Sequence, residues 1–155
     1  EEKYATSIAK NIIKIREKKN IETTFELVDI IKQSMPMKAM RDSHPARRSF
    51  QAIRVEVNKE LEVLEKGLKE AIELLNVNGR ICIISFQSLE DKIVKNMFKK
   101  VSEVSNEMKK LPYIPEEYQP KYRIISKGII ATNKELEENN RAHSARLRVL
   151  EKYKD

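Results

Sequence analysis

The chain has 155 residues, of which 40% are apolar and 35% are charged, a composition typical of one soluble domain or two small ones. Its 3 glycines are too few for a Gly-rich phosphate loop, and its single cysteine, Cys82, excludes an internal disulfide and agrees with a reducing cytoplasm. A net charge of +7 favours a polyanionic partner, and no apolar run reaches the roughly 18 residues of a membrane span, so we expect a cytoplasmic protein without a membrane partner.

Two amphipathic helices are predicted at the start of the chain. Within residues 1–19, apolar side chains recur at steps of three or four, the spacing that places them on one face of a helix. A second helix is expected to begin where Thr23 and Glu26 match a capping box. It should end near Ser34, because a proline two residues later disfavours the helical conformation before it. The segment 35–44 is then predicted to be a loop.

A longer apolar stripe follows this loop. Apolar residues recur at steps of three or four from Phe50 to Leu75, which predicts a helix of up to about 30 residues, bent near Asn58. Asn78 and Gly79 form a typical C-terminal signal and are expected to end it.

A change of period after this helix predicts a strand. The continuous run Ile81–Ile84 is typical of a strand buried on both faces, and hence of a parallel sheet covered by helices. The segment Ser88–Asp91 resembles a capping box and is expected to open another helix. The remaining expected elements are an irregular loop over 105–120, strands over 122–125 and 145–150, and a short helix over 133–138.

These elements define an α/β chain with very little sheet. A strand buried on both faces needs neighbouring strands at its edges, and only two short strands follow this one. We therefore expect either that a segment upstream of Glu1 supplies more strands or that the open sheet edge pairs with another chain, as in a homodimer.

Basic residues gather between Lys38 and Arg54, where five basic side chains accompany one acidic side chain, which predicts a nucleic-acid footprint. Arg47, Arg48 and Arg54 are expected to converge with the N-terminus of the following helix, because guanidinium groups and helix amides both bind phosphate. The alternative is a solvated helix start whose arginines pair with glutamates, with His44 as a loop or capping residue.

Two further polar segments adjoin predicted strands. Ser85–Ser88 follows the buried strand at its carboxyl end, where open α/β sheets bind ligands. There Phe86 could stack on a base and Gln87 could hydrogen-bond its edge. The alternative is a plain strand-to-helix turn with Ser88 as the N-cap. The basic segment Asn139–Arg148 precedes the last strand, and its alternative is an ordinary polar turn.

Three segments together resemble one protein family. Residues 44–54 read HPARRSFQAIR, residues 78–95 contain NGR followed by IISFQSLEDKIVK, and residues 140–148 read NRAHSARLR. In this order they are similar to the carboxyl half of the MraW-type ribosomal RNA methyltransferases, and the resemblance covers nearly the whole chain.

The resemblance implies a class I, Rossmann-like methyltransferase. Such an enzyme transfers a methyl group from S-adenosylmethionine to the exocyclic amine of a cytidine in small-subunit ribosomal RNA, so the expected partner is this RNA or the 30S subunit. Residues 1–45 would form a helical substrate-binding insertion, and residues 46–155 the C-terminal part of the methyltransferase domain. The cofactor-binding residues are expected upstream of Glu1, so that this chain holds none of them and is inactive alone.

For such an enzyme, the strand-end and basic positions of the three segments lead to a hypothesis about which residues meet the RNA. Phe86 and Gln87 would lie near the extruded cytosine, and arginines would hold phosphates. Gln87 stands where the family usually has histidine, so it can bond a base edge but cannot act as a base; Asn140 and His143 also depart from the family, where proline and arginine are commoner. No catalytic base and no metal ligand is assigned. The expected RNA-binding residues are His44, Arg47, Arg48, Gln51, Arg54, Ser85, Phe86, Gln87, Ser88, Arg141, Ser144 and Arg146.

Two other functions compete with this one. A noncatalytic RNA-binding or assembly module would use the same basic segments without a cofactor. A helical interaction protein would instead dimerise through the Phe50–Leu75 stripe, although the predicted strand needs that stripe as its own cover.

Overall fold

The computed structural model describes residues 2–40, 44–105 and 107–155. The chain divides into two compact units, Glu1–Glu60 and Leu61–Asp155, each with its own hydrophobic core. The first unit is helical and the second combines helices with a small sheet, so the expected α/β class is confirmed. Among the described residues, no helix is long and apolar enough to cross a membrane.

The first unit is built on amphipathic helices whose apolar faces meet in one core. Ile8, Ile31 and Ala46 are buried at its centre, which confirms the two helices predicted from the apolar spacing. Its elements are α1 (Ala5–Arg16), α2 (Thr24–Gln33), a 3₁₀ turn at Met37–Met40 and α3 (Arg47–Val57).

The start of α3 belongs to this core, because Ala46 is buried and Phe50 packs against the cluster. The sequence-based boundary between residues 45 and 46 divides the chain by role, into a substrate-binding insertion and part of a catalytic domain. It stays a prediction, since compactness alone does not assign a role.

The predicted capping box at the start of α2 is confirmed. Thr23 Oγ1 accepts the Glu26 N–H at 3.2 Å, and the Glu26 carboxylate accepts the Thr23 N–H at 3.1 Å. A hydrogen bond from Lys19 Nζ at 2.6 Å, with backbone bonds from Glu22 and Thr23, lowers the pKa of Glu26 to about 2. The helix start is therefore held by a carboxylate that stays ionised well into the acid range.

The long helix predicted from Phe50 onward is broken in two. α3 ends at Val57, and α4 (Glu60–Glu73) begins after Lys59, whose φ of 54° lies in the left-handed region. The predicted bend near Asn58 is confirmed, in the stronger form of a break.

The predicted helix end at Asn78 and Gly79 is wrong, because α4 already ends at Glu73. These two residues form the turn into the next strand instead. Asn78, with a φ of 66°, donates its N–H to the Lys152 carbonyl at 2.7 Å, and the Lys152 N–H donates to the Gly79 carbonyl at 3.1 Å. The turn signal was real, but it belongs to the strand and not to the helix.

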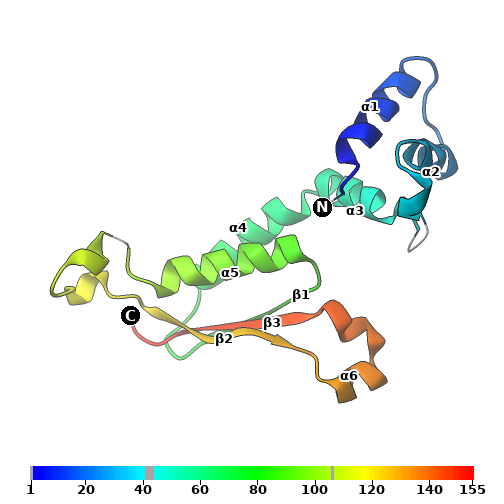
Figure 1. The fold of residues 1–155 in the computed structure, drawn as a ribbon. Coiled ribbons are helices and arrows are strands. Elements are labelled where there is room, and N and C mark those ends of the chain that lie inside the picture. The colour runs from blue at the N-terminus through cyan, green and yellow to red at the C-terminus, as the bar shows by residue number, and fades with distance from the viewer. Residues whose placement is uncertain (1, 41–43, 106) are drawn as a thin grey trace. The chain divides into compact units, whose positions relative to one another are not determined.

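The second unit adds a three-stranded sheet, one long helix and several short elements to α4. They are β1 (Arg80–Ser85), α5 (Ser88–Ser102), β2 (Tyr122–Ile130), α6 (Asn133–Glu138) and β3 (Arg146–Lys152), with 3₁₀ turns at Met108–Lys110, Glu116–Tyr118 and Asn140–Ser144. The strand order is β1-β3-β2, and both outer strands run antiparallel to β3. Helices α4 and α5 lie over the same face of this sheet (Figure 1).

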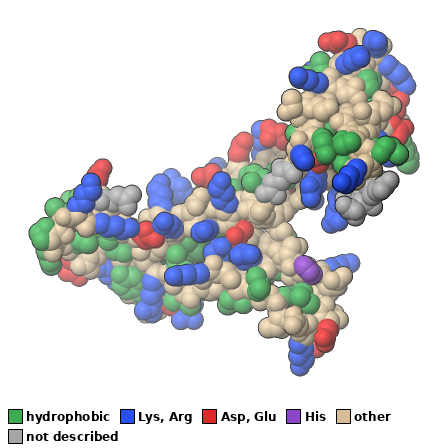
Figure 2. All heavy atoms as spheres, viewed as in Figure 1, with side chains coloured by type: hydrophobic (Ala, Val, Ile, Leu, Met, Phe, Trp, Pro, Cys, Tyr) green, Lys and Arg blue, Asp and Glu red, His purple; other side chains and the backbone are tan. Residues whose placement is uncertain are grey.

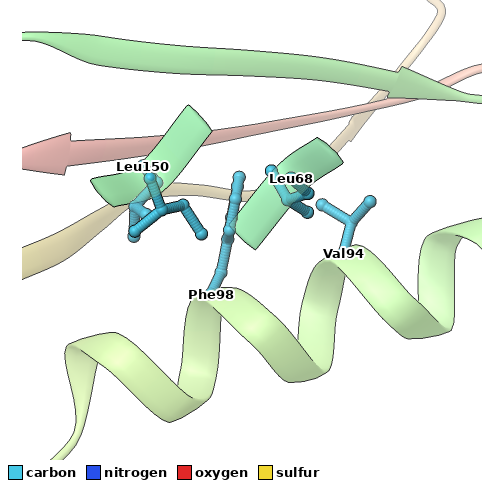
Figure 3. Packing of buried hydrophobic residues seen from close by; sticks show 5 residues of the cluster. Leu68, Val94, Phe98 and Leu150 are labelled. Carbon is cyan, nitrogen blue, oxygen red and sulfur yellow. The ribbon is translucent and has the colours of Figure 1, made fainter. Parts of the chain in front are cut away.

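The core of the second unit lies between that face and the two helices. Leu68 of α4, Val94 and Phe98 of α5 and Leu150 of β3 are all buried there. Figure 3 shows the Phe98 ring standing between Leu150 and Leu68. An aromatic side chain buried in this way is a major contributor to the stability of a small unit.

The predicted parallel pairing and two-sided burial of β1 are wrong for this chain. Ile81 and Ile83 pack against the core, whereas Cys82 and Ile84 are exposed, Ile84 to 59%. Among the described residues β1 pairs only with β3, and the two strands run antiparallel. In the described part of the chain, no helix covers the sheet face that carries Cys82 and Ile84, and no strand pairs with the outer edge of β1.

Candidate nucleic-acid interface

Two exposed arginines open helix α3. Arg47 and Arg48 are its first residues and follow Ala46, which is anchored in the core. No ion pair joins either arginine to another described residue, and residues 41–43 of the same basic segment lie outside the described ranges. Gln51 lies one turn after Arg47 on the same exposed face of the helix. His44 is exposed, and its carbonyl accepts the Arg47 N–H at 3.1 Å, so it closes the turn that leads into α3.

Arg54 does not join this group. Its Nε and Nη2 donate to Oε1 and Oε2 of Glu60 at 2.9 and 3.1 Å, and this pairing lowers the pKa of Glu60. A helix rises about 1.5 Å per residue, so Arg54 stands about 10 Å along the axis from Arg47. The expected convergence of three arginines at the helix N-terminus is therefore wrong, while a role of Arg54 in RNA binding stays a prediction.

The second candidate region is the turn between β1 and α5. Ser85 is buried at the end of β1, Phe86 is 54% exposed, and Gln87 is the N-cap residue of α5. Ser88, considered above as the N-cap, is instead the first residue of the helix. The Glu90 carboxylate accepts the N–H groups of Phe86 and Gln87 at 3.1 and 3.2 Å, which fixes the backbone of this turn. The Phe86 ring is thus exposed to solvent while the backbone that carries it is held by Glu90.

Strand β3 brings the third predicted segment to the same place. Arg146 is the cross-strand partner of Ser85, although 61 residues separate them along the chain. Arg141 and Ser144 are exposed in the 3₁₀ turn that precedes β3. Two of the three predicted segments therefore meet at the carboxyl end of β1. The remaining segment, around Arg47, belongs to the first compact unit.

An enclosed ion pair at this end was not among the predicted site residues. The side chains of Arg148 and Asp91 are only 9% and 19% exposed, and Nε and Nη2 of Arg148 donate to the two carboxylate oxygens of Asp91 at 2.7 and 2.8 Å. Arg148 Nη1 also donates to the Lys127 carbonyl of β2. The Arg148 hydrogen bonds are the main reason that the pKa of Asp91 is lowered. The signal in the sequence was a charged residue within an apolar strand, which must find a buried partner.

Gly128 makes room for these arginines. The pairing of β2 with β3 shifts on both sides of Ser126, and Gly128 takes a φ of 130°, a conformation open mainly to glycine. A Cβ at this position would lie 3.3 Å from Cγ and Cδ of Arg146. The irregular stretch of β2 therefore depends on a residue without a side chain.

Other features of the surface are less specific. Among the described residues, no group of three His, Cys, Asp or Glu side chains is placed to hold a metal ion. Lysine and arginine side chains are spread over the visible surface of each unit and do not form one patch (Figure 2). A shallow hollow of about 300 Å³ on the first unit is lined by Ser7, Lys10, Asn11, Lys14, Gln33 and Ser34.

Comparison with known proteins places the chain in a family. Residues 1–153 match the MraW methylase family. A curated protein of Lactobacillus delbrueckii subsp. bulgaricus, named ribosomal RNA small subunit methyltransferase H, is 56% identical over 154 residues, which are 98% of this chain and 49% of that protein. Proteins of the same name from Lactobacillus gasseri and Lactobacillus acidophilus are 55% and 53% identical, with the same coverage. The chain thus spans about half the length of the curated relatives it matches, and it belongs to the MraW methylase family.

Proposed function

We propose that this chain is the substrate-facing, C-terminal half of a methyltransferase. The whole enzyme would transfer a methyl group from S-adenosylmethionine to the exocyclic amine of a cytidine in small-subunit ribosomal RNA. The observation that carries the proposal is the 56% identity, over 98% of this chain, to a protein named as a small-subunit ribosomal RNA methyltransferase.

The described residues do not fit a cofactor site of their own. S-adenosylmethionine supplies an activated methyl group, and dinucleotide-type folds hold such cofactors at a Gly-rich turn after a strand. Gly67 lies inside α4, Gly79 precedes β1 and Gly128 lies in β2, while the turn after β1 contains Phe86 and Gln87. We therefore assign cofactor binding to the length of the relatives that this chain does not cover.

The uncovered side of the sheet supports the assignment to half of a larger fold. Ile84 of β1 and Ile129 of β2 both lie opposite Leu147 of β3, and they are 59% and 57% exposed. The outer edge of β1 also offers backbone N–H and C=O groups that no described strand pairs with. A further strand beside β1 and a layer over this face would bury both, and a second copy of this chain is the competing occupant of the edge.

Methyl transfer to an exocyclic amine requires a site that holds the base in a fixed orientation, and we assign this role to the turn after β1. The exocyclic amine of cytosine is a weak nucleophile because its lone pair is delocalised into the ring, so the site must hold it close to the methyl donor in a fixed orientation. The base must also leave its stack to be reached. Phe86 offers an aromatic face and Gln87 an amide for the base edge, and Arg47 and Arg48 offer guanidinium groups to phosphates. Gln87 does not titrate, so this chain contributes positioning and not proton transfer at that position.

A chimera tests the proposal. This chain would replace the matching half of the Lactobacillus delbrueckii relative, and the product would be incubated with tritiated S-adenosylmethionine and small-subunit ribosomal RNA. We expect tritium in the RNA and N4-methylcytidine in its nuclease digest. The remaining half of the relative alone is the control and should transfer nothing.

Two other outcomes would contradict parts of the proposal. A folded chimera that binds both cofactor and RNA but methylates nothing would favour a noncatalytic RNA-binding or assembly module. Methylation at another atom would retain the enzyme class and refute the cytosine amine as the target.

A further inference from the structure

We propose that Asp91 and Arg148 are a positioning pair, which holds the segment Ser85–Gln87 in the conformation that receives the target base. This inference rests on the proposed function, because it concerns the same turn after β1. Neither residue belongs to the segment that would touch the base, and both act on it through contacts that the structure describes.

Asp91 contacts the segment on both sides of Phe86. Its backbone N–H donates to the Gln87 carbonyl at 3.0 Å, and its carboxylate accepts a hydrogen bond from Ser85 Oγ at 3.4 Å. The neighbouring Glu90 binds the N–H groups of Phe86 and Gln87. The Glu90 carboxylate therefore holds the backbone of Phe86 and Gln87, the Asp91 carboxylate holds the side chain of Ser85 before them, and the Phe86 ring stays exposed.

Arg148 ties this arrangement to the sheet. It lies on β3, the central strand, and forms a two-bond fork with Asp91. Its third contact, with the Lys127 carbonyl, extends the link to β2. A guanidinium fork fixes direction as well as distance, so the start of α5 cannot rotate over the sheet without breaking it.

The composition of the surrounding core argues that this pair does more than hold the unit together. The buried cluster beneath α5 is entirely apolar, and an enclosed ion pair usually adds no more stability than apolar side chains of similar size. What such a pair does supply is a defined geometry. The Asp91–Arg148 pair lies at the carboxyl end of β1, next to the turn that exposes Phe86.

The test separates geometry from stability with a double substitution. Asp91→Leu with Arg148→Met replaces the pair by apolar side chains, and the melting temperature should stay within a few degrees of the unchanged chain. In the chimera described above, kcat should fall by about tenfold or more while KM for RNA changes little, since displacements of about 1 Å reduce rates by up to about a hundredfold. A double variant that keeps both its melting temperature and its kcat would overturn the proposal.

A milder variant covers the case in which the double variant fails to fold. Arg148→Lys keeps the charge but cannot form the fork, so it should also lower kcat with little effect on KM. The matched control is Glu103→Gln with Lys109→Gln, which removes an exposed ion pair of 3.0 Å at the other end of α5 and should leave kcat unchanged. Equal kcat in Arg148→Lys and in the control would count against a positioning role.

A measurement on the chain itself distinguishes failure of this inference from failure of the proposed function. In the Asp91→Leu and Arg148→Met double variant, α5 and its Glu90 are no longer tied to β3, so amide hydrogen exchange at Phe86 and Gln87 should become about tenfold faster, and in the Glu103 and Lys109 control it should not change. If these amides keep their protection, the positioning role is refuted even where the chimera is active. If they lose it while the unsubstituted chimera transfers no methyl group, the proposed function fails and the structural part of the inference stands.

Discussion

The arginines at the start of α3 and the arginine inside β3 illustrate two uses of the same side chain. Arg47 and Arg48 are exposed and form no ion pair with another described residue, so their charge is available to a polyanion. The side chain of Arg148 is 9% exposed and directs its donors to Asp91 and to the Lys127 carbonyl. The first pair should contribute little to stability and much to RNA binding. Arg148 should affect function only through geometry, and its removal alone should destabilise the unit because the Asp91 carboxylate would stay enclosed without the fork.

Removal of Arg148 tests the buried side of this comparison. Arg148→Ala leaves the enclosed Asp91 carboxylate with only the longer contact to Arg146, at 3.9 Å, and we expect a loss of about 3 kcal/mol in the free energy of unfolding. Urea unfolding followed by circular dichroism measures it. Arg146→Ala is the control, because its side chain is 47% exposed and should cost about 0.5 kcal/mol or less. Equal losses of unfolding free energy in Arg148→Ala and Arg146→Ala would contradict a special structural role for the enclosed arginine.

Gly128 offers a second test of the buried arginine, because its missing side chain leaves the space in which Arg146 and Arg148 of β3 lie. Gly128→Ala should lose about 1.5 kcal/mol, because the residue has a φ of 130° and its new Cβ would press on Arg146. Gly67→Ala provides the opposite control. Nothing lies within 4 Å of a Cβ at Gly67 in α4, so that change should stabilise the helix by about 1 kcal/mol. Thermal unfolding should therefore show a lower melting temperature for Gly128→Ala and a higher one for Gly67→Ala than for the unchanged chain.

The pH dependence of stability should also distinguish the buried Arg148 pair from the exposed Arg47 and Arg48. The pKa of Asp91 is lowered from its ordinary value of 3.8, so the folded state holds its proton less tightly than the unfolded chain. The contribution of the pair is therefore complete above pH 3.8 and is lost as the pH falls toward the lowered pKa. Urea midpoints measured from neutral to acid pH should fall less steeply in Asp91→Asn than in the unchanged chain. In Arg47→Ala with Arg48→Ala the slope should match that of the unchanged chain.

The exposed arginines should have the smallest effect on stability. Arg47→Ala with Arg48→Ala should change the free energy of unfolding by less than about 0.5 kcal/mol. The slope of log affinity for a small-subunit ribosomal RNA fragment against log salt should become shallower by about two phosphate contacts. Lys66→Ala with Lys69→Ala on α4 is the matched loss of two exposed charges. An unchanged slope in the arginine variant would refute the phosphate assignment.

Local features of this fold were predictable from the sequence. The capping box at Thr23 and Glu26, the short helix over 133–138 and the turn signal at Asn78 depend on neighbouring residues, and each occurs in the structure. The end of α4 was misplaced because the same turn signal serves a strand as well as a helix.

Features set by distant residues were not predictable in the same way. The antiparallel entry of β3 between β1 and β2 depends on pairing across the chain, and the apolar run Ile81–Ile84 does not reveal that one of its faces lacks a cover. The same holds for the pairing of Asp91 with Arg148, which are 57 residues apart. The cross-strand pairing of Ser85 with Arg146, which places Arg146 beside the turn after β1, could not be predicted from their spacing along the chain either.

Photo-crosslinking to a substituted base tests most directly whether the turn after β1 receives the target. Small-subunit ribosomal RNA fragments that carry 5-iodocytidine at single positions would be irradiated with the chimera, and the adducts mapped by mass spectrometry. We predict a crosslink to Phe86 at the cytidine that becomes methylated, and its loss in Phe86→Leu. A crosslink at that cytidine to a residue outside 85–88, unchanged in Phe86→Leu, would contradict the assignment of this turn.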